Sequence, residues 1–306
     1  MTNTVNFCFI GRRVALLIGN SYMGENVPLP GCIKDVEAMQ KKLADCGFRV
    51  TSRFDLTQSQ MFHEFSSFLN KTKSNDTLLF YFSGHGVEYK GLQYFIPVGM
   101  DDPEYEQDIV KTAFSCDHAI QIMMEKVKKQ LKIIISDACR SEFKMVLRDI
   151  GSRTGNTYDS INIEFDPNKT KKEYEARSDG FVIGQNLTSN KSVCSGFDNG
   201  QPNLEAVFEN ALSTGLNSTD KHNIVRMCAV SRGEMADAGQ NNDLSYYTKS
   251  LTNNMLNWNQ SILRLNIKIS ENFRKWGAKP EIAIIAPDET VNTFRFRVPF
   301  KTAKIT

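Results

Sequence analysis

The chain has 306 residues, and its 37 lysines and arginines nearly balance its 35 aspartates and glutamates, which leaves a formal net charge of +2. This length is enough for one large domain or two small ones with a sizeable core. The near-neutral charge argues against partners that bulk electrostatics would attract, such as nucleic acid or an acidic membrane surface. Because no apolar run approaches the roughly 18 to 20 residues that span a bilayer, we expect no membrane partner either.

The seven cysteines are an odd number and include no CxxC pair. The first residues lack the basic region followed by an apolar region that marks a secretory signal peptide. Unpaired thiols without a secretory signal are typical of a reducing compartment. The sequence therefore predicts a cytoplasmic protein whose cysteines are free.

The first half of the chain alternates short apolar runs with amphipathic segments. Residues 32–46 show the second pattern, since Ile33, Val36, Met39 and Leu43 recur at helical spacing before a glycine. On such patterns we predict strands at 14–19, 48–54, 77–82, 93–98 and 132–136, and helices at 32–46, from 56 to the polar cluster at 71–76, and at 119–129. Strands alternating with helices of this kind imply crossover connections, a mostly parallel sheet and helices on both faces.

The second half begins with a long polar stretch. Residues 148–219 are rich in Gly, Asn, Ser, Thr and charge, and such stretches inside a domain are typically functional loops or linkers. The core pattern resumes at 224–230, followed by predicted helices at 245–258 and 261–276 and strands at 281–285 and 293–298. We therefore predict a single α/β domain over residues 1–306, with about six strands in its sheet and a mobile insertion at 148–219.

Two predicted strands end in small polar clusters that each carry a reactive side chain. The run LLFYFSGHG at 78–86 presents His85, and IIISDACR at 133–140 presents Cys139. Sites in open α/β sheets form at the carboxyl ends of the strands. A free thiol has a pKa of about 8.5 and is mostly protonated at neutral pH, so it needs a base such as imidazole to become a nucleophile. We therefore predict a catalytic pair of Cys139 and His85.

The backbone around this pair suits acyl transfer. Residues 136–140 are expected to end a strand and open a helix, whose N-terminal amides favour an anion. The glycines that flank His85 let the backbone approach a substrate closely. The amides of Gly86 and Cys139 are then expected to form an oxyanion hole, which contributes about 3 kcal/mol per donor in other acyl-transfer sites.

The remaining histidines and cysteines have structural roles in this interpretation. His63 and His118 lie on amphipathic helices and His222 in a loop, and a lone buried cysteine is more often a small hydrophobic residue than a nucleophile. No second His or Cys lies at metal-ligand spacing from His85 or Cys139. We therefore predict no metal site and no cofactor.

In combination, these motifs resemble the caspase-like cysteine peptidases, the group of caspases, metacaspases and paracaspases. The caspase signature is a cysteine in Q-A-C-[RQG]-G with a histidine about 50 residues upstream, and here His85 precedes Cys139 by 54 residues. The resemblance covers most of the chain, through ALLIGN, LPGCIKDVEAM, FDLT, SGHG, YFIPV, SDACR and CAVSRGEMADAG. It implies a caspase-like α/β sandwich and a cysteine endopeptidase that acts through a thioester acyl-enzyme.

The details resemble the paracaspase and metacaspase branch, and within it the paracaspases. Four residues before Asp35, where caspases have an Asp-binding arginine, this chain has Gly31, and Asp137 replaces the glutamine two residues before the nucleophile. By resemblance, Asp35 and Asp137 line a pocket for a basic side chain, and a third acid falls at Asp237, with Glu234 as its rival. Carboxylates favour Lys or Arg, and Arg gains most through bidentate pairing.

The resemblance also sets the expected substrates and regulation. We expect protein or peptide substrates that are cut after Arg, with Lys as the second choice. Many metacaspases owe their calcium dependence to an Asp-rich segment, which has no clear match after Gly86 in this chain. Asp101 and Asp102 nevertheless leave a metal site as an alternative. A homodimer through the last strand, at 293–298, is implied as well. The candidate self-cleavage sites are the basic residues of the insertion, Arg148, Arg153, Lys169, Lys171, Lys172, Arg177 and Lys191.

Several alternatives stay open on the sequence. Asp35 is also compatible with a solvated position on a helix, and Asp137 with a helix N-cap. A peptidase that cuts after Asp is possible if arginines from elsewhere, such as Arg232, enter the pocket. The fold can also serve a weakly active scaffold for assembly with other proteins.

Overall fold

A computed structural model describes residues 11–100, 108–126, 130–141, 223–237, 243–257, 260–273, 279–286 and 292–296. The predicted insertion at 148–219 lies outside the described residues, and so do Asp101, Asp102 and His222. The homodimer and the self-cleavage of the insertion therefore stay predictions.

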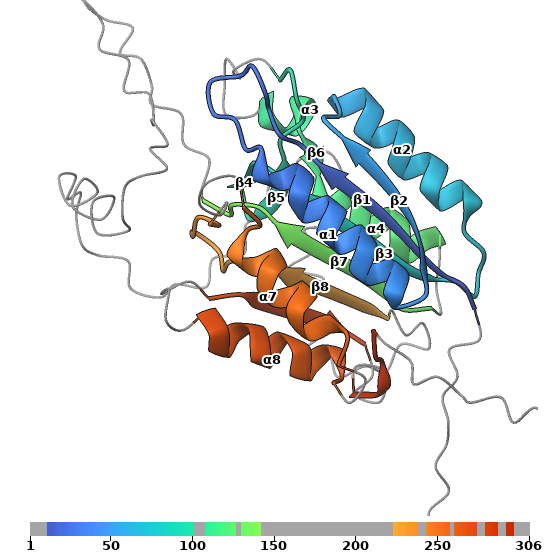
Figure 1. Cartoon of the computed structure of the whole chain (residues 1–306). Coiled ribbons are helices and arrows are strands. Elements are labelled where there is room, and N and C mark those ends of the chain that lie inside the picture. Colours follow the sequence, from blue (N-terminus) through green and yellow to red (C-terminus); the bar gives the residue numbers. More distant parts are fainter. Residues whose placement is uncertain are drawn as a thin grey trace, which may run out of the picture. The chain divides into compact units, whose positions relative to one another are not determined.

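A six-stranded sheet forms the centre of the described structure (Figure 1). Its strands lie in the order β2 (Phe48–Phe54), β1 (Arg13–Gly19), β3 (Thr77–Ser83), β7 (Lys132–Asp137), β8 (Ile224–Cys228) and β9 (Glu281–Ile285). Neighbouring strands are parallel from β2 to β8, and only β9 runs antiparallel to its neighbour. The mostly parallel sheet of about six strands is thereby confirmed.

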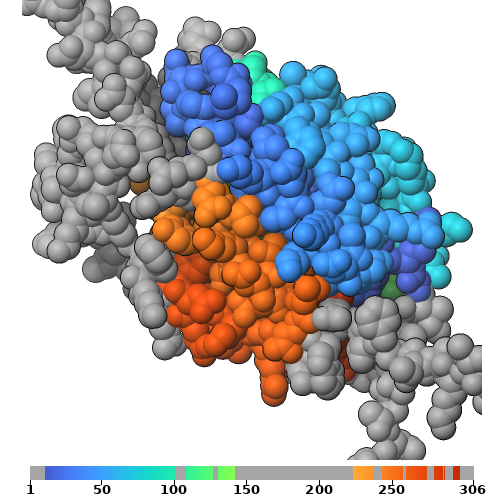
Figure 2. Space-filling view, viewed as in Figure 1, coloured from blue at the N-terminus to red at the C-terminus, as the bar shows by residue number. Residues whose placement is uncertain are grey.

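Helices cover both faces of this sheet, as the alternation of side chains along the strands requires. In β1, Ala15 and Leu17 face one core, and Leu16 and Ile18 face the other. The first core is closed by α1 (Gly31–Asp45), α7 (Tyr246–Met255) and α8 (Ile262–Phe273), and the second by α2 (Gln58–Lys71) and α4 (Cys116–Lys126). In Figure 2 the surfaces of α1, in blue, and α7, in orange, meet along one side of the molecule.

A small antiparallel sheet follows directly after the first reactive residue. It consists of β4 (Gly86–Tyr89), β5 (Leu92–Phe95) and the short β6 (Phe114–Ser115), which follows the single-turn α3 (Ile109–Thr112). Lys90 and Gly91 form the tight turn, with φ of 49° and 78°. The predicted strand at 93–98 is therefore part of a hairpin, and it ends at Phe95.

The predicted last strand, at 293–298, is wrong for its described part. Asn292 and Thr293 are helical, and residues 294–296 form no strand. Phe294 and Phe296 are both buried in the first core, and the guanidinium of Arg13 lies 5.2 Å from the ring centre of Phe294. The two aromatic residues at a spacing of two thus belong to an irregular segment that packs on the core. In the described part of the chain, the sheet instead ends at β9.

The described helices give no candidate for a membrane span, because none of them is both long enough and apolar enough to cross a bilayer.

Candidate active site

The register of β3 and β7 brings the two reactive residues to the same edge of the sheet. Ser83 pairs with Asp137 at the ends of these parallel strands, and His85 and Cys139 each lie two residues later. The amide of Gly84 donates to the Asp137 carbonyl at 3.3 Å. A Cβ on Gly86 would come within 2.8 Å of the Cys139 carbonyl oxygen, so only glycine fits the close approach of the two backbones there. The equal offset from the paired strand ends therefore places both predicted residues at the same edge of the sheet.

The imidazole of His85 is held by the loop between β1 and α1. Its Nε2 atom lies 2.7 Å from the carbonyl oxygen of Val27. Because a carbonyl can only accept, Nε2 carries the hydrogen, which leaves Nδ1 of the neutral ring as a proton acceptor. Burial lowers the pKa of His85, and the Val27 carbonyl and the charge of Glu25 oppose this effect. His85 is therefore a neutral base at physiological pH.

The thiol of Cys139 is also neutral in this state. Burial raises its pKa to about 11, while the amide of Ala236, 3.3 Å from Sγ, lowers it. Residues 139–141 are not helical, so the expected helix does not begin there, and residues 142–148 lie outside the described part of the chain. Among the described residues, no hydrogen bond joins the imidazole to the thiol. The two groups lie at one edge of the sheet but engage other partners.

The amide of Gly86 faces the side on which an oxyanion hole was expected. In an antiparallel ladder, the amides of successive residues point to opposite sides of the strand. The Ile96 amide donates to the His85 carbonyl at 3.0 Å, so His85 faces β5 and Gly86 faces away from it, like Glu88, whose amide donates to Ser141 at 2.9 Å. Gly86 thus points its amide toward the strand end that carries Cys139.

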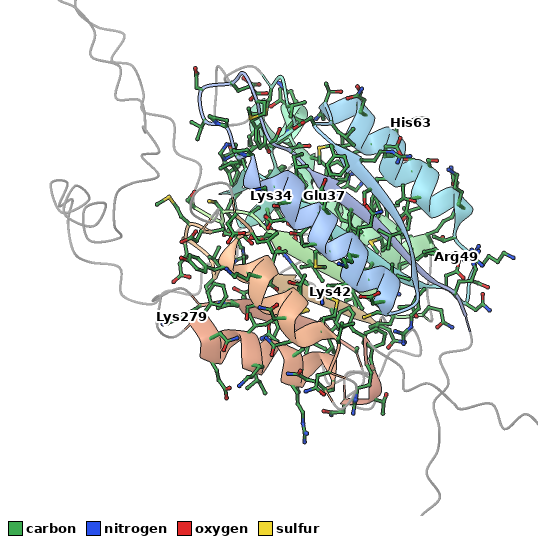
Figure 3. All side chains as sticks on the ribbon, viewed as in Figure 1. Lys34, Glu37, Lys42, Arg49, His63 and Lys279 are labelled. Carbon is green, nitrogen blue, oxygen red and sulfur yellow. The ribbon has the colours of Figure 1, made fainter. Side chains whose placement is uncertain are left out.

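Two of the three predicted pocket acids are buried beside this edge. Asp35 lies on α1 with 1% of its surface exposed, and Asp137 ends β7 with 5% exposed. The neighbouring α1 residues Lys34 and Glu37 point to solvent (Figure 3), so Asp35 is not a solvated helix residue. Asp137 is not the N-cap of a described helix either, because its carboxylate accepts hydroxyl groups from α7.

Ser245 connects the two buried carboxylates. Its amide donates to Asp35 Oδ1 at 2.9 Å, and its hydroxyl donates to Asp137. The hydroxyl of Ser83 supplies the second bond to Asp35, at 2.9 Å, and that of Thr248 the second bond to Asp137, at 2.7 Å. Ser245 also caps α7 by accepting the Thr248 amide, so the helix terminus itself holds both acids in place.

Burial raises the pKa of both acids, and the charge of a neighbouring carboxylate adds to this effect. The pKa of Asp35 is raised well above its usual range, mainly by burial and then by the charge of Asp137. Burial raises the pKa of Asp137 to about 6, the hydroxyls of Ser245 and Thr248 lower it, and the nearby charge of Asp237 raises it further. A pair of carboxylates that compete for one proton is poised to bind a cation.

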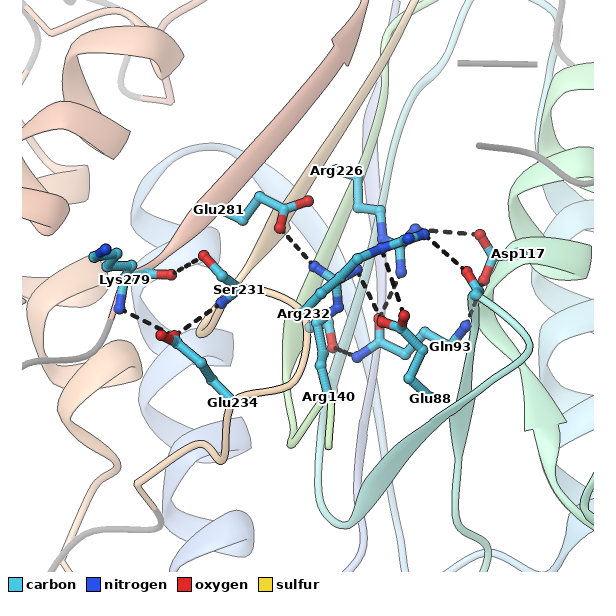
Figure 4. Close-up of polar contacts among 12 residues, drawn as sticks. Glu88, Gln93, Asp117, Arg140, Arg226, Ser231, Arg232, Glu234, Lys279 and Glu281 are labelled. Carbon is cyan, nitrogen blue, oxygen red and sulfur yellow. Dashed lines mark hydrogen bonds and ion pairs between the residues drawn. The ribbon is translucent and has the colours of Figure 1, made fainter. Parts of the chain in front are cut away.

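The two candidates for the predicted third acid, Asp237 and Glu234, have different surroundings. Asp237 is exposed on the loop after β8 and acts on Asp137 through its charge. The Glu234 carboxylate instead accepts the amides of Ser231 at 3.3 Å and Lys279 at 3.4 Å (Figure 4). Of the two candidates, Asp237 is therefore the one whose charge acts on Asp137.

Arg140, the residue after the thiol, ties this edge to the neighbouring elements (Figure 4). Its guanidinium donates to Glu281 on β9 at 2.9 Å and to Glu88 on β4 at 3.3 Å. Its amide donates to the Glu234 carbonyl at 2.9 Å, and its carbonyl accepts the amide of Gly233 at 2.9 Å. The segment that carries Cys139 is thus fixed from three directions.

Sequence patterns did not reveal several residues of this site. Ser245 has a partial signal, since a serine directly before a helical pattern is a typical N-cap. Tyr22, Val27 and Thr248 have none, because their contacts join segments that are far apart in the chain. Among the described residues, no group of three or more His, Cys, Asp or Glu side chains is arranged to hold a metal ion.

Comparisons with known proteins agree with this geometry. The caspase domain family matches residues 12–286. The human mucosa-associated lymphoid tissue lymphoma translocation protein 1 is 30% identical over 128 residues, which are 42% of this chain and 15% of that protein. Metacaspase-8 of Arabidopsis thaliana is 31% identical over 147 residues, 42% of this chain and 37% of that protein. The match thus spans well under half the length of these relatives, and it agrees with the predicted paracaspase and metacaspase branch.

Solved structures resemble the fold at low sequence identity. Caspase-1 from Spodoptera frugiperda superposes with a TM-score of 0.54 at 12% identity, over 90% of this chain and 88% of that chain. Protein GSU0716 from Geobacter sulfurreducens gives a TM-score of 0.58 at 13% identity, over 94% and 99%. At these identities the likeness concerns the fold alone, whereas the family match covers most of the sequence. The chain belongs to the caspase domain family of cysteine peptidases.

Proposed function

We propose that this protein is a cysteine endopeptidase that cuts after Arg, and more slowly after Lys. The observation that carries this proposal is the pair of buried carboxylates, Asp35 and Asp137, at the strand edge that also presents Cys139 and His85. Desolvated carboxylates that share hydroxyl and amide donors offer a fixed site for a planar guanidinium. The exposed Asp237 adds negative charge that acts on Asp137.

The chemistry depends on the neutral state of both catalytic groups. Nδ1 of His85 takes the proton from Sγ as the sulfur attacks the carbonyl carbon of the scissile bond. The amide of Ala236 lies 3.3 Å from Sγ, and it stabilises the negative charge that develops there. The amides of Gly86 and Cys139 stabilise the oxyanion. The imidazolium then protonates the leaving amine, and water hydrolyses the thioester with His85 as the base.

Fluorogenic peptides that end in Arg, Lys or Asp test this proposal. We expect the highest kcat/KM with Arg and no detectable cleavage in Cys139→Ala. Replacing Asp137 by Asn should lower kcat/KM for Arg peptides about 100-fold, because a desolvated charge pair is lost. The matched control is Glu234→Gln, whose side chain caps Ser231 and Lys279 and should leave the preference unchanged. A preference for Asp peptides would overturn the assigned specificity.

A peptidase that cuts after Asp is disfavoured by the position of Arg232. Its guanidinium lies 3.5 Å from Glu88 and donates to the Gly91 carbonyl at 3.0 Å, so it is engaged at the β4–β5 hairpin. The weakly active scaffold is tested by an active-site thiol probe. The probe carries an Arg side chain that directs it to the proposed pocket. If this probe labels Cys139 no faster than it labels the other cysteines, the peptidase proposal fails.

Regulation is proposed at two places. In the part of the chain that the structure describes, β9 is the edge strand, and an edge strand can pair with a second copy of the chain through backbone donors and acceptors. An enzyme of this specificity can also cut itself after the basic residues of the 148–219 insertion. Mass measurement of wild type and Cys139→Ala after incubation distinguishes self-cleavage from cleavage by other proteases.

A further inference from the structure

The side chain of Tyr22 reaches the backbone of His85. It is buried, with 1% of its surface exposed, and its hydroxyl oxygen lies 3.0 Å from the His85 amide and 2.6 Å from the Ile96 carbonyl oxygen. An amide can only donate and a carbonyl can only accept. The hydroxyl therefore accepts from His85 and donates to Ile96.

This hydroxyl replaces one bond of the β4–β5 ladder. His85 and Ile96 face each other just outside the paired residues Gly86 and Phe95. The Ile96 amide donates directly to the His85 carbonyl at 3.0 Å, and the return bond would run from the His85 amide to the Ile96 carbonyl. Tyr22 is inserted into that return bond. The hydroxyl thus sets the distance between the His85 backbone and the end of β5.

The same residue contacts the imidazole. The rings of Tyr22 and His85 have centroids 4.4 Å apart with an interplanar angle of 43°. On another side, the ring nitrogen Nε2 meets the Val27 carbonyl, which belongs to the same loop as Tyr22. The orientation of the imidazole, and with it the direction of Nδ1, therefore depends on contacts from this one loop.

The backbone of Tyr22 has an unfavourable conformation in the structure that makes this contact. Tyr22 has a φ of 53°, in the left-handed region that is unfavourable for a bulky residue. A Cβ on Gly84 would come within 2.8 Å of the Tyr22 hydroxyl oxygen. The first glycine of the SGHG motif thus leaves room for this hydroxyl, which links two segments about 60 residues apart.

We propose that Tyr22 is a positioning residue for the catalytic reaction, whose hydroxyl and ring hold His85 with Nδ1 directed to act as the base. This inference rests on the proposed function, since it assigns Tyr22 a role in the same reaction. Tyr22 touches no reacting atom and acts through His85 alone. Its loss should therefore affect kcat much more than KM.

The first test compares Tyr22→Phe with Tyr247→Phe. Tyr247 is a matched control because it is also a buried tyrosine, but its hydroxyl has no hydrogen-bond partner among the described residues. We expect Tyr22→Phe to lower kcat on Arg peptides about tenfold with KM within about twofold, and Tyr247→Phe to change neither. An equal loss of kcat in both variants would show that Tyr22 contributes only to general packing, and it would overturn the proposal.

The second test reads the imidazole itself and needs no peptide cleavage. In protein labelled with ¹⁵N-histidine, the shifts of the His85 ring nitrogens, assigned with His85→Ala, report which nitrogen carries the proton. We expect the Nε2–H form in wild type and in Tyr247→Phe, and a mixture of both forms in Tyr22→Phe. An unchanged Nε2–H form in Tyr22→Phe contradicts the proposal. If wild type cuts no peptide, the proposed function fails while this measurement still decides the role of Tyr22.

A second variant separates the side-chain contacts from the strained backbone. Asparagine tolerates the left-handed conformation but is too short to reach Ile96 or to cover the imidazole. We expect Tyr22→Asn to lose at least as much kcat as Tyr22→Phe while thermal unfolding confirms that it is folded. Wild-type kcat in folded Tyr22→Asn would show that the backbone conformation alone positions His85.

Discussion

Asp137 is surrounded by hydroxyl groups at the boundary between the sheet and α7. The hydroxyl of Thr248 donates to it, and the Tyr81 hydroxyl, 2.6 Å from that of Thr248, extends the chain into the core. Hydrogen bonds to the charged form favour ionisation, yet burial outweighs them, and the pKa of Asp137 rises to about 6. The residue is thus held in place as a carboxylate whose charge depends on pH near neutrality.

Binding of a basic side chain should therefore depend on pH. A carboxylate with a pKa of about 6 loses its charge as the pH falls through that value, and Asp35, whose pKa is also raised, acts in the same direction. We expect KM for Arg peptides to rise between about pH 7 and pH 5. Steady-state kinetics on wild type and Asp137→Asn test this, because the variant should lack most of the pH dependence. A flat wild-type KM over this range would contradict the assignment.

The same pKa predicts how the free energy of unfolding changes with pH. Because the pKa of Asp137 is higher in the folded protein than its ordinary value of 3.8, the folded state binds more protons than the unfolded state between these values. The contribution of this group to the free energy of unfolding therefore falls as the pH rises from about 4 to about 6. Urea titrations at several pH values in this window measure the free energy of unfolding of wild type and Asp137→Asn. It should fall more steeply with rising pH in wild type than in the variant.

At the scale of elements, the position of α1 over β1 decides where Asp35 lies. A Cβ on Gly19, the last residue of β1, would come within 2.8 Å of the Cys32 carbonyl and 2.7 Å of a methyl group of Val36. The helix therefore crosses the end of the strand at a distance that only glycine permits. Asp35 sits on the same turn of α1 and reaches the carboxyl edge of the sheet for this reason.

Replacing Gly19 by Ala should move α1 and disturb the pocket more than the catalytic pair. Overpacking of this kind typically costs about 1–3 kcal/mol in the free energy of unfolding. We expect that loss in urea titrations, together with a severalfold higher KM for Arg peptides. Lys34→Ala, an exposed position on the same helix, is the control and should stay within about 0.5 kcal/mol of wild type. If Gly19→Ala is destabilised but keeps the wild-type KM, the pocket does not depend on the position of α1.

At the scale of the whole molecule, Arg140 joins the central sheet to the small sheet. Its side chain is 1% exposed and pairs with Glu88, which is 12% exposed, and with Glu281, which is 37% exposed. A buried guanidinium that loses its carboxylate is left uncompensated, whereas an exposed partner is screened by solvent. The stability of buried Arg140 therefore depends more on Glu88 than on Glu281.

We expect Glu88→Gln to lower the free energy of unfolding by about 1–3 kcal/mol and Glu281→Gln by less than about 1 kcal/mol. The double variant should lose more than the sum of the two, because each acid compensates Arg140 when the other is removed. Urea titrations of the three variants measure this difference. Equal effects of the two single variants would show that Glu281 is as important to Arg140 as Glu88.

Local patterns in the sequence were sufficient for most of the parallel sheet and for the position of His85 and Cys139 at one edge of it. Continuous apolar runs along β1, β3 and β7 predicted these strands, because a strand buried on both faces must be apolar on both faces. The equal offset of His85 and Cys139 from the paired ends of β3 and β7 then results from parallel register. The family resemblance supplied Asp35, Asp137 and Asp237, which no periodicity indicates.

Only the tertiary structure decided how these residues are held. Ser245 meets Asp35 across 210 positions of sequence, and His85 meets Val27 across 58. It also decided that β9 is antiparallel and that Phe294 and Phe296 pack on the core without forming a strand. Sequence periodicity reports which face of an element is buried, but it does not report which distant element covers that face. The reactive residues were therefore readable from the chain, whereas the contacts that orient them depend on long-range packing.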